Sequence, residues 1–196
     1  MKRAKKALIF LLCLVLVLAL LMVGYDLLQR RRMMAALEQQ ALTGDELPTE
    51  TYAAVENAAE ESGSYTQDGE FIAGYTLRVP EDYAENAVNE RKTVYEKGDA
   101  FLSLEIVPHR EAAALKPAYL DDFIDYTDIT FMGVDALPGT VYQAQRIYAG
   151  NGNSVCQAWL IDADRGAVCL VIGCDADDTD AWGELNAIAA TLEIQQ

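Results

Sequence analysis

An uninterrupted apolar stretch near the N-terminus constrains this chain more than any other feature. It starts at Ala7, contains no charged residue as far as Val23, and continues through Gly24 to Tyr25. Nineteen helical residues, at about 1.5 Å each, span roughly 28 Å, which is close to the hydrocarbon core of a bilayer. A helix that is apolar on every side presents no face to water. We therefore expect residues 7–25 to form a transmembrane helix that anchors the chain in lipid.

The four basic residues that precede this stretch also suit a cleavable signal peptide. Two observations favour an uncleaved anchor instead. The apolar run is longer than a usual signal core, and no pair of small residues follows it as a cleavage site. Arg30, Arg31 and Arg32 then resemble the basic residues that stop the transfer of a membrane helix more than they resemble the start of a mature chain.

Basic residues flank the anchor on both sides and indicate its direction. Four Lys and Arg side chains lie before it, whereas three arginines, offset by Asp26, lie after it. Because positive charge favours the cytoplasmic side, we expect residues 1–6 to be a cytoplasmic tail and the rest to lie outside.

The remainder of the chain is strongly acidic. Of the 15 Lys and Arg residues, seven lie in the first 32 positions. The other eight lie from Thr43 onward, together with 29 of the 31 Asp and Glu residues. Such a body is repelled by nucleic acid and by anionic lipid, and it suits cations, basic peptides or a basic patch on another protein. The alternative is an acidic surface that serves solubility alone.

Between anchor and body we expect two connecting segments. Residues 26–42 lack Gly and Pro and are rich in helix formers, so they predict a juxtamembrane helix. Leu27, Met34 and Leu37 occupy heptad-like positions that suit weak self-association, but two heptads are too few for a coiled coil. Residues 43–69 are acidic, small and polar, and we expect them to form a tether with some helix between Glu50 and Ser62.

Alternating apolar residues from Phe71 to Val79 open a globular body at residues 70–196 and predict a strand that Pro80 ends. Further strands are expected over residues 92–96, 101–107, 141–148, 155–161 and 168–172, and helices over 117–126 and 179–190. Short turns join most of these strands, so hairpins outnumber crossovers. This pattern predicts an α+β fold in which helices cover an antiparallel β-sheet.

The first strand of the body carries a family resemblance. It runs Gly74-Tyr75-Thr76-Leu77-Arg78-Val79-Pro80-Glu81-Asp82-Tyr83 and resembles the opening of PsbP-like domains. The closing residues Leu185, Ile188, Ala189, Thr191, Leu192 and Ile194 resemble the family's last helix and short strand. The resemblance covers roughly residues 70–195 and implies a non-enzymatic accessory or binding domain. It carries over no functional residue, because the matching positions are structural.

Three cysteines lie in the body and leave two alternatives open. If Asp162 lies opposite Val168 in a hairpin, then Cys156 falls opposite Cys174, and a cross-strand disulfide is geometrically feasible. A register one residue different places the two on opposite faces and leaves buried free thiols. The spacing lacks the second ligand pair of a zinc site, so we expect no metal there.

Two polar features have residue types found in functional sites, but their positions predict structural roles. Asp175, Asp177, Asp178 and Asp180 fail the spacing of a calcium-binding EF-hand loop, and they stand where a helix begins, so we expect them to cap that helix. His109, the single histidine, follows a strand and is expected on the surface. No nucleophile-elbow, phosphate-binding or dinucleotide-binding sequence accompanies it.

The sequence thus predicts a membrane-anchored extracytoplasmic domain that binds a protein partner of the envelope, uses no cofactor and is not an enzyme. One alternative is an assembly protein that acts through its anchor and juxtamembrane helix. Another is an envelope enzyme that uses paired carboxylates, although nothing in the sequence singles out a pair.

Overall fold

The structure is a computed structural model that describes residue 55 and residues 57–123 and 128–195. The expected transmembrane segment at 7–25, the juxtamembrane helix at 26–42 and the first half of the expected tether lie outside these residues. Within the described ranges, no helix is long and apolar enough to cross a membrane.

Two antiparallel sheets and two helices make up the described part of the chain. The smaller sheet has the order β1-β2-β10, with β1 at Ala58–Gln67, β2 at Glu70–Pro80 and β10 at Glu193–Gln195. The larger sheet has the order β3-β4-β5-β9-β8-β7-β6. Its strands are β3 (Ala84–Asn89), β4 (Lys92–Lys97), β5 (Ala100–Pro108), β6 (Asp128–Ala136), β7 (Gln143–Gly150), β8 (Ser154–Ala163) and β9 (Gly166–Asp175).

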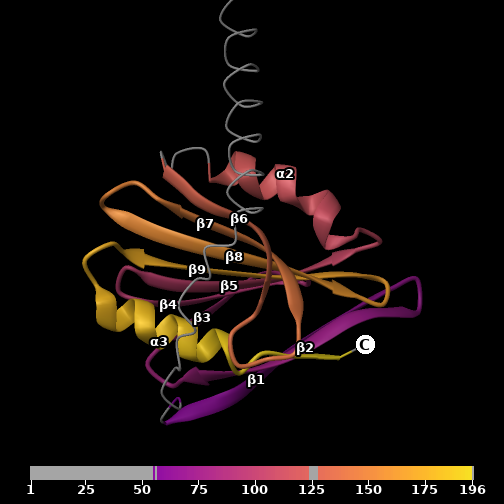
Figure 1. Ribbon diagram of the computed structural model, residues 1–196. Helices are drawn as coiled ribbons and strands as arrows, with labels where there is room; N and C mark the ends of the chain where they lie inside the picture. Colours follow the sequence, from indigo (N-terminus) through magenta and orange to yellow (C-terminus); the bar gives the residue numbers. More distant parts are fainter. Residues whose placement is uncertain (1–54, 56, 124–127, 196) are drawn as a thin grey trace, which may run out of the picture. The chain divides into compact units, whose positions relative to one another are not determined.

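The elements form layers around the larger sheet (Figure 1). Helix α2 (Ala112–Asp122) covers one face over β7, β8 and β9, while α3 (Thr179–Ala189) and strand β2 of the smaller sheet cover the other. The α+β class with antiparallel sheets is therefore confirmed, but there are two sheets where the sequence predicted one.

Strand β9 lies at the centre of the larger sheet and is buried on both faces. Leu170 pairs with Leu104 of β5 on one side and with Trp159 of β8 on the other, and all three side chains are fully buried. Their face of the sheet packs against Leu185 and Ile188 of α3 in one hydrophobic core. A strand shielded on both sides needs apolar residues at nearly every position, which explains the unbroken apolar run of the sequence here.

The N-terminal boundary of the domain was predicted incorrectly. Residues 58–67, assigned to the tether and partly to a helix, form β1, which pairs antiparallel with β2 along its length. Asp68 and Gly69 both have positive φ, at 52° and 82°, as the two central residues of a tight hairpin turn do. The Ala and Glu residues of β1 favour a helix locally, but pairing with β2 outweighs that preference.

Two further strands and one helix boundary also differ from the prediction. Strands β3 and β6 are the edge strands of the larger sheet and were not predicted; β3 is exposed at all six positions, so it lacks the apolar alternation that identifies a strand. Helix α2 begins at Ala112, five residues before the expected start at Pro117, and contains that proline in its interior.

The N-terminus of α3 is formed as expected. Asp178 is its N-cap residue, and its Oδ1 accepts a hydrogen bond of 2.9 Å from the backbone N–H of Ala181. The carboxylate satisfies one of the free N–H groups of the first turn. The capping role predicted for this acidic run is confirmed for Asp178.

The residues that carry the PsbP-like resemblance have structural roles. Tyr83 is buried, and its hydroxyl donates to Oε2 of Glu184 on α3 at 3.2 Å. The Lys97 ammonium lies 2.9 Å from the same carboxylate, 2.8 Å from Asp82, and 5.3 Å from the centre of the Tyr83 ring. Its hydrogen bond lowers the pKa of Asp82, while burial raises the pKa of Tyr83. The cluster joins the end of β2 and strand β4 to α3.

A substitution in β1 tests whether this strand belongs to the domain. A β-carbon at Gly63 would lie 2.5 Å from the ring of Tyr75, which is buried against it. We expect Gly63→Ala to lower the free energy of unfolding by about 1–3 kcal/mol, because the ring or the strand must move. Urea unfolding measures the change.

The control for this prediction is the neighbouring Ser64→Ala, on the exposed side of the same strand, which we expect to change stability by less than about 0.5 kcal/mol. Equal, small effects of the two substitutions would show that β1 does not pack on the domain.

Candidate functional site

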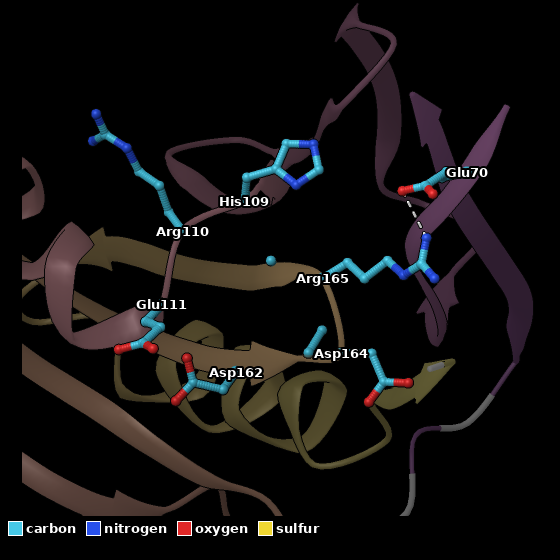
Figure 2. A pocket seen from close by; sticks show the side chains of 9 residues that line it. Glu70, His109, Arg110, Glu111, Asp162, Asp164 and Arg165 are labelled. Carbon is cyan, nitrogen blue, oxygen red and sulfur yellow. Dashed lines mark ion pairs between the residues drawn. The ribbon is translucent and has the colours of Figure 1, made fainter. Parts of the chain in front are cut away.

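A polar hollow of about 500 Å³ lies where three segments distant in sequence meet (Figure 2). One is the loop after β5, another is the turn between β8 and β9, and the third is the start of β2. Its lining comprises Glu70, His109, Arg110, Glu111, Asp162, Ala163, Asp164, Arg165 and Gly166. Seven of these nine residues carry a charged side chain or an imidazole ring, so the hollow suits a polar ligand.

The wall formed by the β5 loop is held by backbone contacts. Strand β5 ends at Pro108, and His109 adopts a φ of 55°, in the left-handed region that is uncommon outside glycine. Its backbone N–H donates to the carbonyl oxygen of Arg165 at 2.8 Å. At Gly166 the strands approach so closely that a β-carbon would meet the carbonyl of Val107. These contacts fix where the loop leaves the sheet.

Asp162 connects the hollow to α2. Its Oδ1 accepts a hydrogen bond of 2.6 Å from the backbone N–H of Ala112, the first residue of that helix. Glu111, the N-cap residue itself, makes no capping hydrogen bond with its side chain. The Asp162 carboxylate, from a neighbouring strand, thus accepts a hydrogen bond from a free N–H group at the N-terminus of α2. Its negative charge also interacts favourably with the positive end of the helix dipole.

The residues that line the hollow carry more negative than positive charges. Arg165 and Glu70 form an ion pair of 2.7 Å across one edge (Figure 2). Three carboxylates then remain, Glu111, Asp162 and Asp164, against one guanidinium, that of Arg110. Such a surplus attracts cationic groups. The lining contains no hydroxyl or thiol that could act as a nucleophile.

Sequence reasoning found only part of this site. His109 is exposed after a strand end, as expected, and it lies at the hollow. The carboxylates beside it were missed, since the site depends on a hairpin end and a loop that are more than 50 residues apart. The available signal was the charged sequence Asp162-Ala163-Asp164-Arg165-Gly166 between two predicted strands.

The structure decides between the alternatives for the cysteines. Asp162 pairs with Ala167, one residue away from the expected register, so Cys156 lies opposite Gly173 and Cys174 opposite Val155. The side chains of Cys156 and Cys174 therefore point to opposite faces of the sheet. The disulfide considered between them does not form: among the described residues, Cys156, Cys169 and Cys174 are buried and none is joined in a disulfide.

Burial also suppresses ionisation of two of these thiols. Desolvation raises the pKa of Cys169 to about 12 and that of Cys174 to about 11. Since the thiolate is the reactive form, both groups are chemically inert at neutral pH.

Within the described ranges, no group of three His, Cys, Asp or Glu side chains is placed to hold a metal ion.

Comparison of the chain with known proteins gives likenesses of structure only. No protein-family model matches the chain, and no curated protein matches it. Among solved structures, the cyanobacterial PsbP protein CyanoP of Synechocystis is 14% identical, with 76% of this chain and 100% of that chain covered and a TM-score of 0.49. The chain resembles PsbP-like domains.

Two other solved structures are similar to the chain. LpqN of Mycobacterium tuberculosis, described as involved in cell envelope biogenesis, is 14% identical, with 70% of this chain and 92% of that chain covered and a TM-score of 0.38. A protein of Bacteroides thetaiotaomicron is 11% identical with a TM-score of 0.40, and the match covers 62% of this chain but only 45% of that one. At these values the likenesses carry no argument about activity.

Removal of the Asp162 carboxylate tests its role at the start of α2. We expect Asp162→Ala to lower the free energy of unfolding by roughly 1 kcal/mol, because the N–H of Ala112 loses its acceptor. Asp162→Asn keeps an acceptor oxygen and should lose less. Urea unfolding of both variants measures the difference, and an Asn variant as unstable as the Ala variant would refute the capping role.

The state of the thiols is tested by titration with a disulfide reagent, in a Cys13→Ser background and without reductant. At pH 8 the folded protein should react slowly, because Cys156, Cys169 and Cys174 are buried. In denaturant, all three thiols should react at once. Only one reactive thiol in denaturant would show that two of them are joined in a disulfide.

Proposed function

We propose that this protein is a membrane-anchored extracytoplasmic accessory domain that binds a basic group of an envelope protein at the polar hollow. The observation that carries the proposal is the surplus of carboxylates there: apart from the Glu70–Arg165 ion pair, the lining holds the carboxylates of Glu111, Asp162 and Asp164 and one guanidinium, that of Arg110. A Lys or Arg side chain of a partner supplies the missing positive charge, and a hollow of about 500 Å³ accommodates it.

Long-range electrostatics support the same kind of partner. Beyond Thr43 the chain carries eight Lys and Arg residues against 29 Asp and Glu, so its field attracts basic surfaces and speeds their encounter. The hydrophobic stretch at residues 7–25 supports attachment to the membrane, and the basic residues before it support a position of the domain outside the cytoplasm. Binding without turnover is the role we assign, since the lining of the hollow holds no hydroxyl or thiol and its carboxylates are open to solvent.

Site-specific photocrosslinking in intact membranes tests this proposal. A photoreactive amino acid is placed at Ala163 in the hollow and, as a matched control, at Ala87 on the exposed strand β3. We expect one defined protein adduct from position 163 and none of that size from position 87. The adduct should weaken as salt is raised, because exposed charges are screened.

Charge-neutralising variants decide whether the carboxylates of the hollow are responsible. The triple variant Glu111→Gln, Asp162→Asn and Asp164→Asn should reduce the adduct at least tenfold. The control variant Glu60→Gln, Glu85→Gln and Glu90→Gln removes the same charge from exposed positions elsewhere and should leave it nearly unchanged. Failure to form an adduct at position 163, or equal losses in the two variants, would contradict the proposal.

A further inference from the structure

Strand β1 lies at the border of the smaller sheet and offers an unpaired edge. It pairs with β2 along its ten residues, and no strand in the described part of the chain pairs with its other side (Figure 1). Every second residue of an edge strand points its backbone N–H and C=O groups away from the sheet. A strand of another molecule can pair with these groups.

One hydrogen bond identifies the residues of β1 that point outward. The backbone N–H of Arg78 on β2 donates to Oγ1 of Thr191 at 2.9 Å, on the side of β2 where β10 lies. Backbone groups alternate in direction along a strand, so those of Tyr75 point the other way, toward its partner Gly63 on β1. By the same alternation, three exposed residues of β1 direct their backbone groups away from β2: Glu60, Ser62 and Ser64.

This edge lacks the features that normally prevent strand pairing. Natural edge strands are protected by lysine, by proline, by a bulge or by short length. Strand β1 contains no Lys or Pro, and its one irregularity, at Tyr65 and Thr66, lies near the hairpin end. Strand β3, at the edge of the larger sheet, has only six residues and a shifted register. The first seven residues of β1 therefore form a regular edge that is open to a partner strand.

Two carboxylates lie beneath this edge. Glu61 is on the same side of β1 as Gly63, which lies against the ring of Tyr75. Glu85 of β3 pairs with Tyr95 of β4. Burial raises the pKa of both tyrosine hydroxyls, and the negative charges of Glu61 and Glu85 contribute to each shift, so the two carboxylates lie near the same hydroxyls. Among the described residues, no Lys or Arg forms an ion pair with either carboxylate.

Charge also determines which strand fits this edge. From Thr43 onward the chain carries 29 Asp and Glu residues against eight Lys and Arg, so a second copy would present an acidic surface and be repelled. Residues 43–56, which precede β1, contain four acidic residues and no Lys or Arg. A strand that contains a basic residue and comes from a different protein is complementary.

We propose that β1 is a docking edge for an extended segment of another protein, which adds to the three-stranded sheet and places a Lys or Arg side chain between Glu61 and Glu85. The backbone of this segment pairs with the outward groups of Glu60, Ser62 and Ser64. None of these residues lines the hollow, and the inference does not depend on the function proposed for it.

Amide hydrogen exchange, followed by nuclear magnetic resonance of the full chain in uncharged detergent micelles, tests this pairing residue by residue. The probe is the capped peptide Thr-Val-Thr-Lys-Thr-Val-Thr, added to roughly 5 mM because a short flexible peptide loses affinity through its ordering. Near saturation, exchange of the outward amides of Glu60, Ser62 and Ser64 should slow about tenfold or more. The amides of Glu61 and Gly63, which already point to β2, should change little. The same peptide with Glu in place of Lys should bind about tenfold more weakly, since repulsion replaces attraction.

A proline substitution tests whether the backbone of β1 makes the contact. Ser62→Pro removes an N–H that β2 does not use, so the domain should keep its native amide spectrum while peptide binding is lost. Ser62→Ala keeps that N–H and should bind as the unaltered protein does.

Charge-neutralising pairs test the role of the two carboxylates separately. Glu61→Gln with Glu85→Gln should weaken binding of the Lys peptide about fivefold. Glu60→Gln with Glu96→Gln removes the same charge from exposed positions that point away from this region and should leave binding nearly unchanged. Three results would each overturn the proposal: no slowing with the Lys peptide, equal binding of the two peptides, or slow exchange of the outward amides without any peptide, as pairing with a second copy or with the chain's own preceding segment would cause.

Discussion

Burial of strand β9 on both faces is the constraint on which the rest of this structure depends. The strand separates α2 from α3 and the smaller sheet, and Val168, Leu170 and Ile172 are almost fully buried between β5 and β8. Each buried apolar side chain of this size contributes about 1.5–3 kcal/mol relative to exposure. The ends of β5 and β8 and the start of β9 build the hollow, so the candidate site is an extension of this core.

The parts of the fold that could be read from the sequence are those with a periodic apolar signal. Strands β2, β5, β8 and β9 and helix α3 were predicted because their buried residues recur at regular spacing. The strands that were missed owe their place to pairing rather than to their own residues: β1 lies against β2 with Gly63 under the Tyr75 ring, and β3 has no buried residue. The turn Asp68-Gly69 was a usable hairpin signal for β1, but the helix-forming residues before it obscured it.

Sites proved harder to predict than strands, because they depend on register. The single-residue difference in the pairing of β8 and β9 moves Cys156 and Cys174 to opposite faces, and composition carries no information about that choice. The hollow requires Glu111 and Asp162 to meet, which follows from the start of α2 beneath the β8–β9 turn. By contrast, the capping role of Asp178 was predictable, since a helix end needs only local residues.

The hydrophobic stretch, the acidic charge and the hollow together support our proposal of a domain held at the outer face of a membrane, where its surplus of carboxylates recruits a basic partner. Its central claim is the position of the domain, and protease treatment of intact cells carrying a C-terminal tag tests that claim most directly, with any cell wall removed and the tag followed in membrane and medium. The account predicts a tag that stays with the membrane and is digested without lysis. A tag protected until lysis would place the domain in the cytoplasm, and a tag released into the medium would show that the N-terminal segment is cleaved.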